Sequence, residues 1–275
     1  MSEIFAFRGR TAIVTGAASG IGAALAEALA DRGCHLILAD IDAAGLAAIA
    51  ERVARPRQDV TTRVLDIADG EAIKAFAAET AEGRGPVHLL FNNAGVALGG
   101  TFEQVAEADF EWLMDINFYG VVRMTRAFLP LLRRADAAQI VNISSIFGIV
   151  APPGQTAYSA AKFAVRGFSN ALRHELDGSS IGVTTVHPGG IATAIADRAR
   201  MPDGTSEAEI EAGRERARRA LVMPPAEAAR IILKAVERRK PRVLVGRDAH
   251  TIAILERLNP VNYWKSIEGQ LKPKS

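Results

Sequence analysis

The sequence is poor in several features that would each indicate a particular class of protein. Cys34 is its only cysteine, so an internal disulfide and a metal site built on cysteines are both excluded. No uninterrupted apolar run reaches the length of a membrane-spanning helix. The first residues include an acidic side chain and lack an apolar run of signal-peptide length. We therefore expect a cytoplasmic protein that does not associate with a membrane.

An excess of charge of one sign is also missing. The net charge is +2 over 275 residues, too little to favour a nucleic acid as a partner. Hydrophobic residues make up 49% of the chain and charged residues 23%, which is ordinary for a globular protein and unlike a disordered one. The length allows one large domain or two small ones. A globular enzyme or binding protein is the class that remains.

The first forty residues carry the pattern of a dinucleotide-binding unit. An apolar, β-branched run at 11–15 predicts a buried strand. Three glycines follow at once: Gly16, Gly20 and Gly22. The stretch 23–32 is rich in alanine and leucine and predicts a helix, and 35–39 predicts a second strand that Asp40 closes. Strand, glycine turn, helix, strand and acid is the order of such a βαβ unit.

The glycines are not spaced as G-x-G-x-x-G, but they can perform the same physical task. A tight turn at a helix N-terminus directs backbone N–H groups at a pyrophosphate, although an ordinary strand–helix turn is the alternative. Asp40 can accept hydrogen bonds from a ribose hydroxyl and would repel a 2′-phosphate, and no cation stands beside it. Its alternative role is a helix N-cap. The sequence favours NAD over NADP as the cofactor.

Strands and helices alternate along the rest of the chain. Short apolar runs predict further strands at 60–65, 87–91, 139–143, 181–186 and 242–245. Helices are predicted at 42–55, 69–82, within 102–133, and at 156–175, 206–220, 225–239 and 248–258. No repeat or linker divides residues 1–275. The expected fold class is therefore α/β: a single-domain, Rossmann-like, doubly wound parallel sheet of about seven strands with helices on both faces.

Polar and small residues follow two of the predicted strands. Asn92–Gly95 suits either a ligand crevice or a simple turn, and the strand at 139–143 delivers Ser145 to the same edge. Tyr158 and Lys162 are four residues apart on a predicted helix, so they share one face. A lysine cation close to a phenol lowers the pKa of that phenol, which suits proton exchange near neutral pH. Alone, however, a tyrosine and a lysine at this spacing are more often a solvated helix face.

The segment 191–223 interrupts the regular alternation. It is rich in arginine and contains a predicted helix whose glutamates come early and whose arginines come late, an order that complements the helix dipole. A solvated helix is the preferred interpretation over an anion-binding site. Because the connection is unusually long, we expect it to act as a substrate loop or lid.

With these pieces in place, the chain resembles the short-chain dehydrogenase/reductase family in its compact, single-domain form. The likeness runs from about Arg8 to Gly246. The motifs that carry it are TGAASGIG at 15–22, Asp66, NNAG at 92–95, Asn117, Ser145, Tyr158 with Lys162, and PGGIAT at 188–193. Each motif is unremarkable alone, but all of them in this order and spacing form a specific signal.

The resemblance implies catalytic roles for four residues. Tyr158 would be the general acid/base that exchanges a proton with the substrate oxygen. Lys162 would lower the pKa of Tyr158 and hold the nicotinamide ribose. Ser145 would orient and polarise the substrate carbonyl, and Asn117 would support a water relay to Lys162.

The resemblance also implies a binding site for the dinucleotide. The residues around the pyrophosphate would be Gly16, Ser19, Gly20, Ile21 and Gly22, and Asp40 would bind the adenosine ribose. The residues on the adenine side of the crevice would be Asp66, Ile67, Asn93, Ala94 and Gly95. Those around the nicotinamide would be Pro188, Gly189, Ile191 and Thr193, joined by Tyr158 and Lys162 at the ribose. No metal would be needed, because the cofactor carries the hydride.

The C-terminal extension at 247–275 departs from many compact members of the family. That region often forms an interface of the family's tetramers, so the extension puts a tetramer in doubt. A homodimer through the helices around Asn117 and Tyr158 is favoured, with a homotetramer as the alternative.

The resulting functional hypothesis is an oxidoreductase that interconverts a secondary alcohol and a ketone with NAD. Apolar residues near the expected site predict a hydrophobic small-molecule substrate: Val96, Leu98, Ile146, Phe147, Ile149 and Val150. A non-catalytic dinucleotide-binding regulator on the same fold is the alternative, and the intact catalytic set argues against it. An epimerase or dehydratase of the extended branch is disfavoured by the glycine spacing. Substrate identity and reaction direction stay open.

Overall fold

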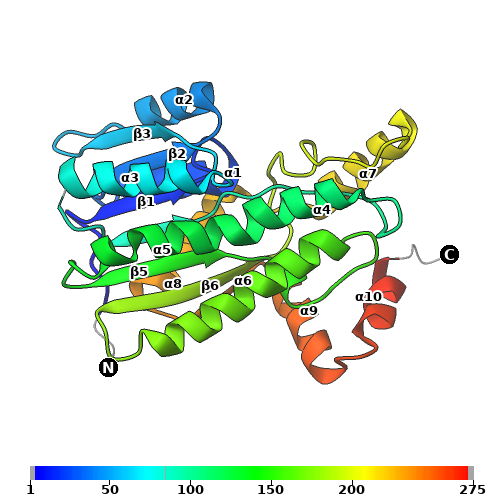
Figure 1. The fold of residues 1–275 in the computed structure, drawn as a ribbon. Coiled ribbons are helices and arrows are strands. Elements are labelled where there is room, and N and C mark those ends of the chain that lie inside the picture. The colour runs from blue at the N-terminus through cyan, green and yellow to red at the C-terminus, as the bar shows by residue number, and fades with distance from the viewer. Residues whose placement is uncertain (1–3, 84, 272–275) are drawn as a thin grey trace.

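A computed structural model describes residues 4–83 and 85–271, and this part of the chain forms one seven-stranded sheet (Figure 1). The strands are β1 (Thr11–Thr15), β2 (His35–Asp40), β3 (Val60–Val64), β4 (Leu89–Asn92), β5 (Ala138–Ile143), β6 (Ile181–Pro188) and β7 (Arg242–Val245). All neighbouring strands are parallel, in the order β3-β2-β1-β4-β5-β6-β7. The single-domain, doubly wound sheet expected from the sequence is confirmed.

The central strands are buried on both faces, which explains why they read as continuous apolar runs. Successive residues of a strand point to opposite faces, so Val14 and Ile13 of β1 enter different cores. Phe91 and Leu90 of β4 likewise enter the cores on opposite faces of the sheet. Strand β5 is buried at every position, whereas the edge strand β3 is largely exposed.

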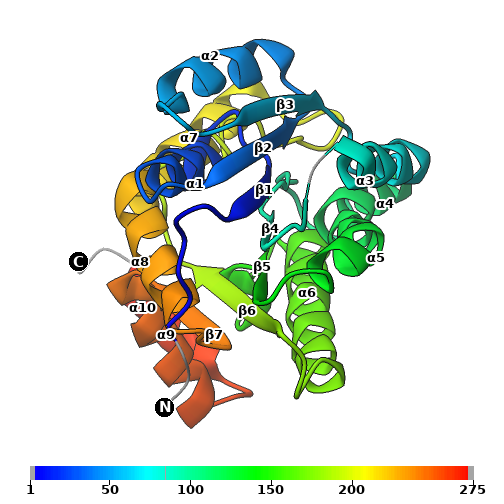
Figure 2. The same ribbon diagram turned by 90° about the vertical axis from the view of Figure 1, so that its left-hand side faces the viewer.

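Three helices cover one face of the sheet: α1 (Gly20–Ala30), α2 (Ala43–Val53) and α8 (Pro225–Glu237) (Figure 2). Leu25 of α1, Ile49 of α2 and Ile232 of α8 are buried in the core on this face. Each of these helices therefore turns one stripe of apolar side chains, repeated at helical spacing, towards the sheet.

The opposite face is covered by α3 (Gly70–Gly83), α5 (Gly120–Leu132) and α6 (Thr156–Glu175). Phe76 of α3 and Phe128 of α5 pack edge to face, with ring centres 5.0 Å apart. The long helix predicted within 102–133 begins only at α4 (Glu107–Met114) and reaches α5 through a π-helical turn, η1 (Asp115–Tyr119). Of the helices in the described part of the chain, none is both long and apolar enough to cross a membrane.

Two segments extend beyond this sandwich. The segment 191–223 leaves the end of β6 and carries α7 (Glu207–Ala220), which stands away from the sheet in Figure 1. Every residue of α7 keeps part of its surface exposed, and Ser206 and Glu209 form a capping box at its start.

The chain continues after β7 as α9 (Arg247–Leu258) and α10 (Tyr263–Leu271). The sequence predicted the first of these helices but not the second, whose residues Tyr263 and Trp264 are fixed by tertiary packing. The last residues of the predicted extension, 272–275, lie outside the described residues. Strand ends also differ slightly from expectation: β4 begins at Leu89 and β6 reaches Pro188, a difference usual at element boundaries.

Candidate active site

The predicted site residues gather at one edge of the sheet. The glycine turn follows β1, Asp40 ends β2, and Asn93–Gly95 follows β4. Ser145 follows β5, and Pro188 ends β6. Because these strands are parallel, their carboxyl ends share one edge, which is where open α/β sheets bind ligands.

The turn after β1 approaches its neighbours so closely that a side chain has no room. Gly16 has a φ of +64°, and a Cβ there would lie 2.8 Å from the Cα of Ala94. A Cβ on Gly22 would lie 1.9 Å from the carbonyl oxygen of Gly16. Ser19 is the N-cap of α1 but makes no side-chain capping bond, and the first turn carries no acid. The N–H groups of this helix end are therefore open to an anion, which fits a pyrophosphate.

Thr15 and Asn93 join this turn to the loop after β4. The Thr15 hydroxyl accepts hydrogen bonds from the backbone N–H groups of Asn93 (3.0 Å) and Ala94 (3.1 Å). The Asn93 amide donates to the carbonyl oxygens of Thr15 (2.9 Å) and Gly16 (3.1 Å). Asn93 thus shapes the glycine turn itself, and Thr15 is a site residue that the sequence reasoning missed.

Asp40 presents its carboxylate to the glycine turn. Its oxygens accept hydrogen bonds from the N–H groups of Ala18 (2.9 Å) and Asp42 (3.0 Å). The alternative role of N-cap belongs to Asp42, whose side chain accepts from the N–H of Gly45 at 3.0 Å. A carboxylate oxygen has two acceptor positions, so Asp40 can still accept a bond from a ribose hydroxyl.

Of the next two predicted residues, Asp66 lies at the surface and Ile67 lies in the core. Asp66 is exposed in the loop between β3 and α3 and accepts a hydrogen bond from the N–H of Ala68 at 2.8 Å. The Ile67 side chain is buried, and a Cβ on Gly120 would lie 2.7 Å from its Cδ1. The Ile67 side chain is therefore part of the contact with α5, which leaves its main chain for any contact with a base.

Tyr158, Lys162 and Ser145 meet between α6 and the end of β5. The Lys162 Nζ lies 5.5 Å from the centre of the Tyr158 ring and donates to the carbonyl oxygen of Ile143 at 3.2 Å. The Ser145 side chain is hydrogen-bonded to the Tyr158 side chain. The Ser145 hydroxyl also accepts from the backbone N–H of Phe147 at 3.1 Å. The face of α6 that carries Tyr158 and Lys162 therefore meets Ser145, which follows β5.

Burial shifts the pKa of both ionisable groups in this cluster. It raises the pKa of the Tyr158 phenol above its ordinary value, and the bond from Ser145 opposes that rise. It lowers the pKa of the Lys162 ammonium to about 8. The sequence predicted that Lys162 would depress the pKa of Tyr158, but the largest cause acting on the phenol is its loss of water, which raises that pKa. At neutral pH the cluster is a protonated tyrosine beside a charged lysine.

Asn117 lies in η1, is fully buried and holds the backbone of Val96 through two hydrogen bonds. Its Oδ1 accepts from the N–H of Val96 at 2.8 Å, and its Nδ2 donates to the carbonyl oxygen of Val96 at 2.9 Å. A Cβ on Gly95 would lie 3.0 Å from the Asn117 Oδ1 and 3.4 Å from the Lys162 Nζ. Asn117 and Lys162 therefore flank the same piece of backbone, while a water relay between them stays a prediction.

The loop Pro188–Thr193 closes the crevice opposite the glycine turn. A Cβ on Gly20 would lie 3.0 Å from the Cγ2 of Thr193, so the loop and the turn are in contact. The Ile191 side chain is buried, and the N–H of Ala192 donates to the carbonyl oxygen of Met223 at 2.8 Å. The loop is thereby tied to the far end of the segment 191–223.

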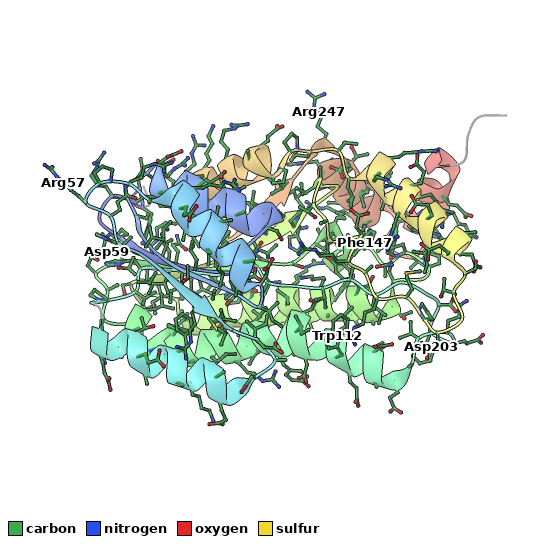
Figure 3. All side chains as sticks on the ribbon, turned by 90° about the horizontal axis from the view of Figure 1, so that it is seen from above. Arg57, Asp59, Trp112, Phe147, Asp203 and Arg247 are labelled. Atoms are coloured by element: carbon green, nitrogen blue, oxygen red, sulfur yellow. The ribbon has the colours of Figure 1, made fainter. Side chains whose placement is uncertain are left out.

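The C-terminal helices support the chain that follows Ser145, along the 3-10 turn η2 (Ile146–Gly148). A buried apolar cluster joins the two regions: Ile146, Ile149, Val150, Ala249 and Ile267. The Tyr263 hydroxyl accepts from the N–H of Ala151 at 2.9 Å. Ile146, Ile149 and Val150 were expected beside the site, and their burial places them behind the wall of the crevice. Phe147, labelled in Figure 3, is partly buried, and its ring meets the Tyr158 ring edge to face with the ring centres 6.2 Å apart.

The segment 191–223 is also attached to the loop after β4. The N–H of Arg200 donates to the carbonyl oxygen of Ala97 (3.1 Å), and the Arg200 carbonyl oxygen accepts from Gly99 (2.9 Å). The guanidinium of Arg200 lies 3.5 Å from the ring centre of Trp112 on α4 and pairs with Asp109 at 3.0 Å. The segment thus crosses the mouth of the crevice with contacts on both sides.

Comparison with known proteins agrees with this geometry. Residues 10–203 match the family model described as short chain dehydrogenase, which spans more than half of the chain. The chain belongs to the short-chain dehydrogenase/reductase family. Membership makes it an oxidoreductase of the dehydrogenase/reductase type.

Named relatives of this dehydrogenase/reductase include proteins of similar length. The putative oxidoreductase SadH of Mycobacterium tuberculosis is 40% identical over 263 residues, which cover 95% of both chains. Dehydrogenase/reductase SDR family member 7B of Xenopus laevis is 30% identical, with 96% of this chain and 82% of the relative covered.

Solved members of the family share the fold. A short-chain dehydrogenase/reductase from Burkholderia phymatum, crystallised in complex with NAD, has a TM-score of 0.85 at 31% identity, with 99% of each chain covered. A metagenomic short-chain oxidoreductase in complex with NADP has a TM-score of 0.71 at 26% identity, with 88% of this chain and 98% of that chain covered.

Within this dehydrogenase/reductase, sequence reasoning missed residues that hold the site from a distance. Thr15, Arg200 and Asp248 all bond to loops of the crevice. Thr15 could have been found as the polar residue that follows the apolar run Ala12–Val14 and directly precedes the glycine turn. Arg200 and Asp248 offered no such signal, because their partners lie far away in the chain.

Proposed function

We propose that this protein transfers a hydride between NAD(H) and a secondary alcohol or ketone, with Tyr158 as the general acid/base. The observation that carries the proposal is the meeting of Ser145, Tyr158 and Lys162 at the carboxyl edge of the sheet. A pure binding protein has no need of a proton donor held between a hydroxyl and an ammonium group.

The proton path follows from these contacts. In ketone reduction the Tyr158 phenol gives its proton to the substrate oxygen, and the Ser145 hydroxyl donates a hydrogen bond to that same oxygen. The positive charge of Lys162 stabilises the phenolate that is left. In alcohol oxidation the proton moves in the reverse direction. The nicotinamide, when bound, supplies or accepts the hydride.

The cofactor preference rests on Asp40. The uncapped N-terminus of α1 and the tight approach at Gly16 and Gly22 suit a pyrophosphate. The carboxylate of Asp40 suits ribose hydroxyls and repels a 2′-phosphate, so NAD is preferred over NADP. Family members crystallised with NAD and with NADP support a nicotinamide cofactor in general.

The substrate is a hydrophobic small molecule. Tyr158 belongs to an apolar cluster with Val96 and Leu98, and the Phe147 ring meets the Tyr158 ring edge to face. Such a surface excludes water and binds aliphatic or aromatic groups near the reacting carbon. A polar sugar-like alcohol would leave its hydroxyl groups without partners there.

The segment 191–223 serves as a lid over this substrate. A Cβ on Gly99 would lie 2.7 Å from the Met201 Sδ, and a Cβ on Gly100 would lie 2.4 Å from the Pro202 Cγ. These glycines let the lid rest directly on the backbone after β4. The stacking of Arg200 on Trp112 then holds the lid in the closed position.

The protein assembles as a homodimer through α4, α5 and α6. Large apolar side chains are exposed on this side, among them Phe102 (69%), Tyr119 (48%) and Phe163 (39%). A hollow of about 800 Å³ runs along α4, lined by Phe102, Phe110, Met114 and Tyr119 with three acidic residues. A second copy would cover this surface, and light scattering of the purified protein measures the state directly.

The experiment that tests the activity follows NADH absorbance with a panel of secondary alcohols of graded size and polarity. The proposal predicts turnover that rises with the apolar surface of the alcohol and is faster with NAD than with NADP. If NAD binds but no alcohol in the panel is oxidised, a non-catalytic regulator becomes the better explanation.

A further inference from the structure

His187 is the last residue of β6 before Pro188, and its side chain is fully buried. Its Nδ1 lies 2.9 Å from the backbone carbonyl oxygen of Ser145 on the neighbouring strand connection. The two strands are in register here, because Ser144 donates its N–H to the carbonyl oxygen of Val186 at 2.8 Å. The imidazole of His187 on β6 therefore reaches Ser145, the residue after β5 whose side chain is bonded to Tyr158.

The hydrogen bond defines the tautomer of His187. A carbonyl oxygen can only accept, so Nδ1 must carry the proton and Nε2 must be bare. Among the described residues the buried Nε2 has no hydrogen-bond partner. Burial lowers the pKa of His187 to about 4, and the charges of Arg242 on β7 and Arg166 on α6 act in the same direction. The His187 side chain is therefore neutral near neutral pH, and only its Nδ1 donates a hydrogen bond.

A purely structural explanation accounts poorly for a histidine at this position. Leaving Nε2 buried without a partner costs free energy that an apolar side chain of the same size would avoid. The benefit must therefore come from Nδ1–H. That group shares the Ser145 carbonyl oxygen with the N–H of Gly148, which closes the 3-10 turn at 3.0 Å.

This shared acceptor fixes the backbone from which the Ser145 hydroxyl projects. The same hydroxyl is bonded to Tyr158 and accepts from the N–H of Phe147. If the carbonyl oxygen were released, the turn could rotate and the hydroxyl would leave its place beside the phenol. A chain of contacts thus runs from His187 through Ser145 to Tyr158.

We propose that His187 is a positioning residue for the alcohol/ketone reaction, acting through its Nδ1–H bond to the Ser145 carbonyl oxygen. The inference rests on the proposed function, since it assumes that Ser145 and Tyr158 act on the substrate oxygen. His187 itself touches neither substrate nor cofactor. Its effect is on the proton-transfer step and on the pKa that the step reports.

Two isosteric amides provide the test. The Nδ2 of asparagine occupies the place of Nδ1, so His187→Asn keeps the donor, whereas the amide of His187→Gln falls near the place of Nε2. We expect His187→Gln to lower kcat about tenfold, the loss of one positioning hydrogen bond. We expect His187→Asn to recover kcat to within about threefold of the wild type.

The pH profile separates positioning from mere stability. A weakened bond from Ser145 to Tyr158 should raise the apparent pKa of kcat/KM in His187→Gln but not in His187→Asn. NAD affinity, measured by fluorescence titration, should stay within about twofold in both variants. A cavity or strain effect would lower Tm in both variants and leave the apparent pKa in place.

Equal kcat values and equal pH profiles in the two variants would overturn the proposal, whether both are active or both inactive. Tyr158→Phe is measured beside them with the same substrate. If Tyr158→Phe keeps its turnover, the proposed function itself fails. If Tyr158→Phe is inactive while both His187 variants match the wild type, only the role of His187 fails.

Discussion

The carboxylate of Asp248 accepts a 2.7 Å hydrogen bond from the backbone N–H of Gly190, which lies 58 positions earlier in the chain. A side chain on either of two nearby glycines, Gly189 or Gly246, would displace this carboxylate. A Cβ on Gly189 would lie 2.1 Å from an Asp248 oxygen, and one on Gly246 would lie 2.2 Å from the other. The start of α9 is therefore joined to the loop assigned to the nicotinamide.

This contact predicts that Asp248→Ala weakens cofactor binding. Loss of the bond lets the loop Pro188–Thr193 move, so the Kd for NAD should rise about three- to tenfold. Titration of protein fluorescence with NAD measures the change. Arg247→Ala is the matched control, because Arg247 points away from the molecule in Figure 3. Identical Kd values for the two variants would argue against a role for Asp248.

Asp40 is expected to set the choice between NAD and NADP. Asp40→Asn removes the charge that repels a 2′-phosphate, so the ratio of kcat/KM for NAD over NADP should fall about tenfold or more. Steady-state kinetics with both cofactors measures this ratio.

Asp42→Ala is the control for that experiment. Asp42 caps α2 through the N–H of Gly45, so its loss should cost about 1 kcal/mol of stability and leave the cofactor ratio unchanged. A wild-type enzyme that favours NADP by kcat/KM would refute the role given to Asp40.

Lys162 gives the protein a defined dependence of stability on pH. Burial lowers the pKa of Lys162 from its ordinary value of 10.5 to about 8 in the folded protein, so the unfolded chain binds more protons between these values. Stability conferred by this site should therefore rise as pH increases from about 8 to about 10.5. The wild type should gain about 2 to 3 kcal/mol relative to Lys162→Met between pH 7 and pH 10.

Urea unfolding of both proteins at several pH values measures that difference. A constant difference between wild type and Lys162→Met over this range would mean that the ammonium is well solvated in the folded protein. A difference that changes in the opposite direction would contradict the burial of Lys162.

Arg200 is expected to hold the lid closed. Arg200→Ala removes the stacking on Trp112 and the ion pair with Asp109, so the KM of the alcohol should rise about three- to tenfold while the Kd for NAD stays constant. Trypsin should also cleave the arginine-rich α7 faster. Arg198→Ala, an exposed substitution in the same segment, should behave as the wild type. Unchanged KM and cleavage in Arg200→Ala would mean that the lid is held elsewhere.

The sheet was predictable because its signals are local. Buried parallel strands read as short apolar runs, and the glycine turn and Asp40 stand at their ends in the chain. The helical spacing of Tyr158 and Lys162 likewise places them on one face before any tertiary contact is considered. Ser145 could be added because parallel strands share one carboxyl edge.

The features that sequence reasoning missed depend on distant contacts. The π-helical turn at Asp115–Tyr119 interrupts a regular apolar pattern, and α10 is fixed by packing on the chain after Ser145. The direction of the Tyr158 pKa shift was also out of reach, since it depends on how much water the surrounding side chains remove. Local pattern therefore predicts which residues meet, and packing decides how they behave.

The central claim is that Tyr158 moves the proton while the cofactor exchanges the hydride. Its most direct test compares turnover and NAD affinity in Tyr158→Phe, which keeps the ring and removes only the hydroxyl. We predict a loss of at least about 100-fold in kcat, with the Kd for NAD within about twofold of the wild type. Turnover at the wild-type rate in Tyr158→Phe would contradict the account.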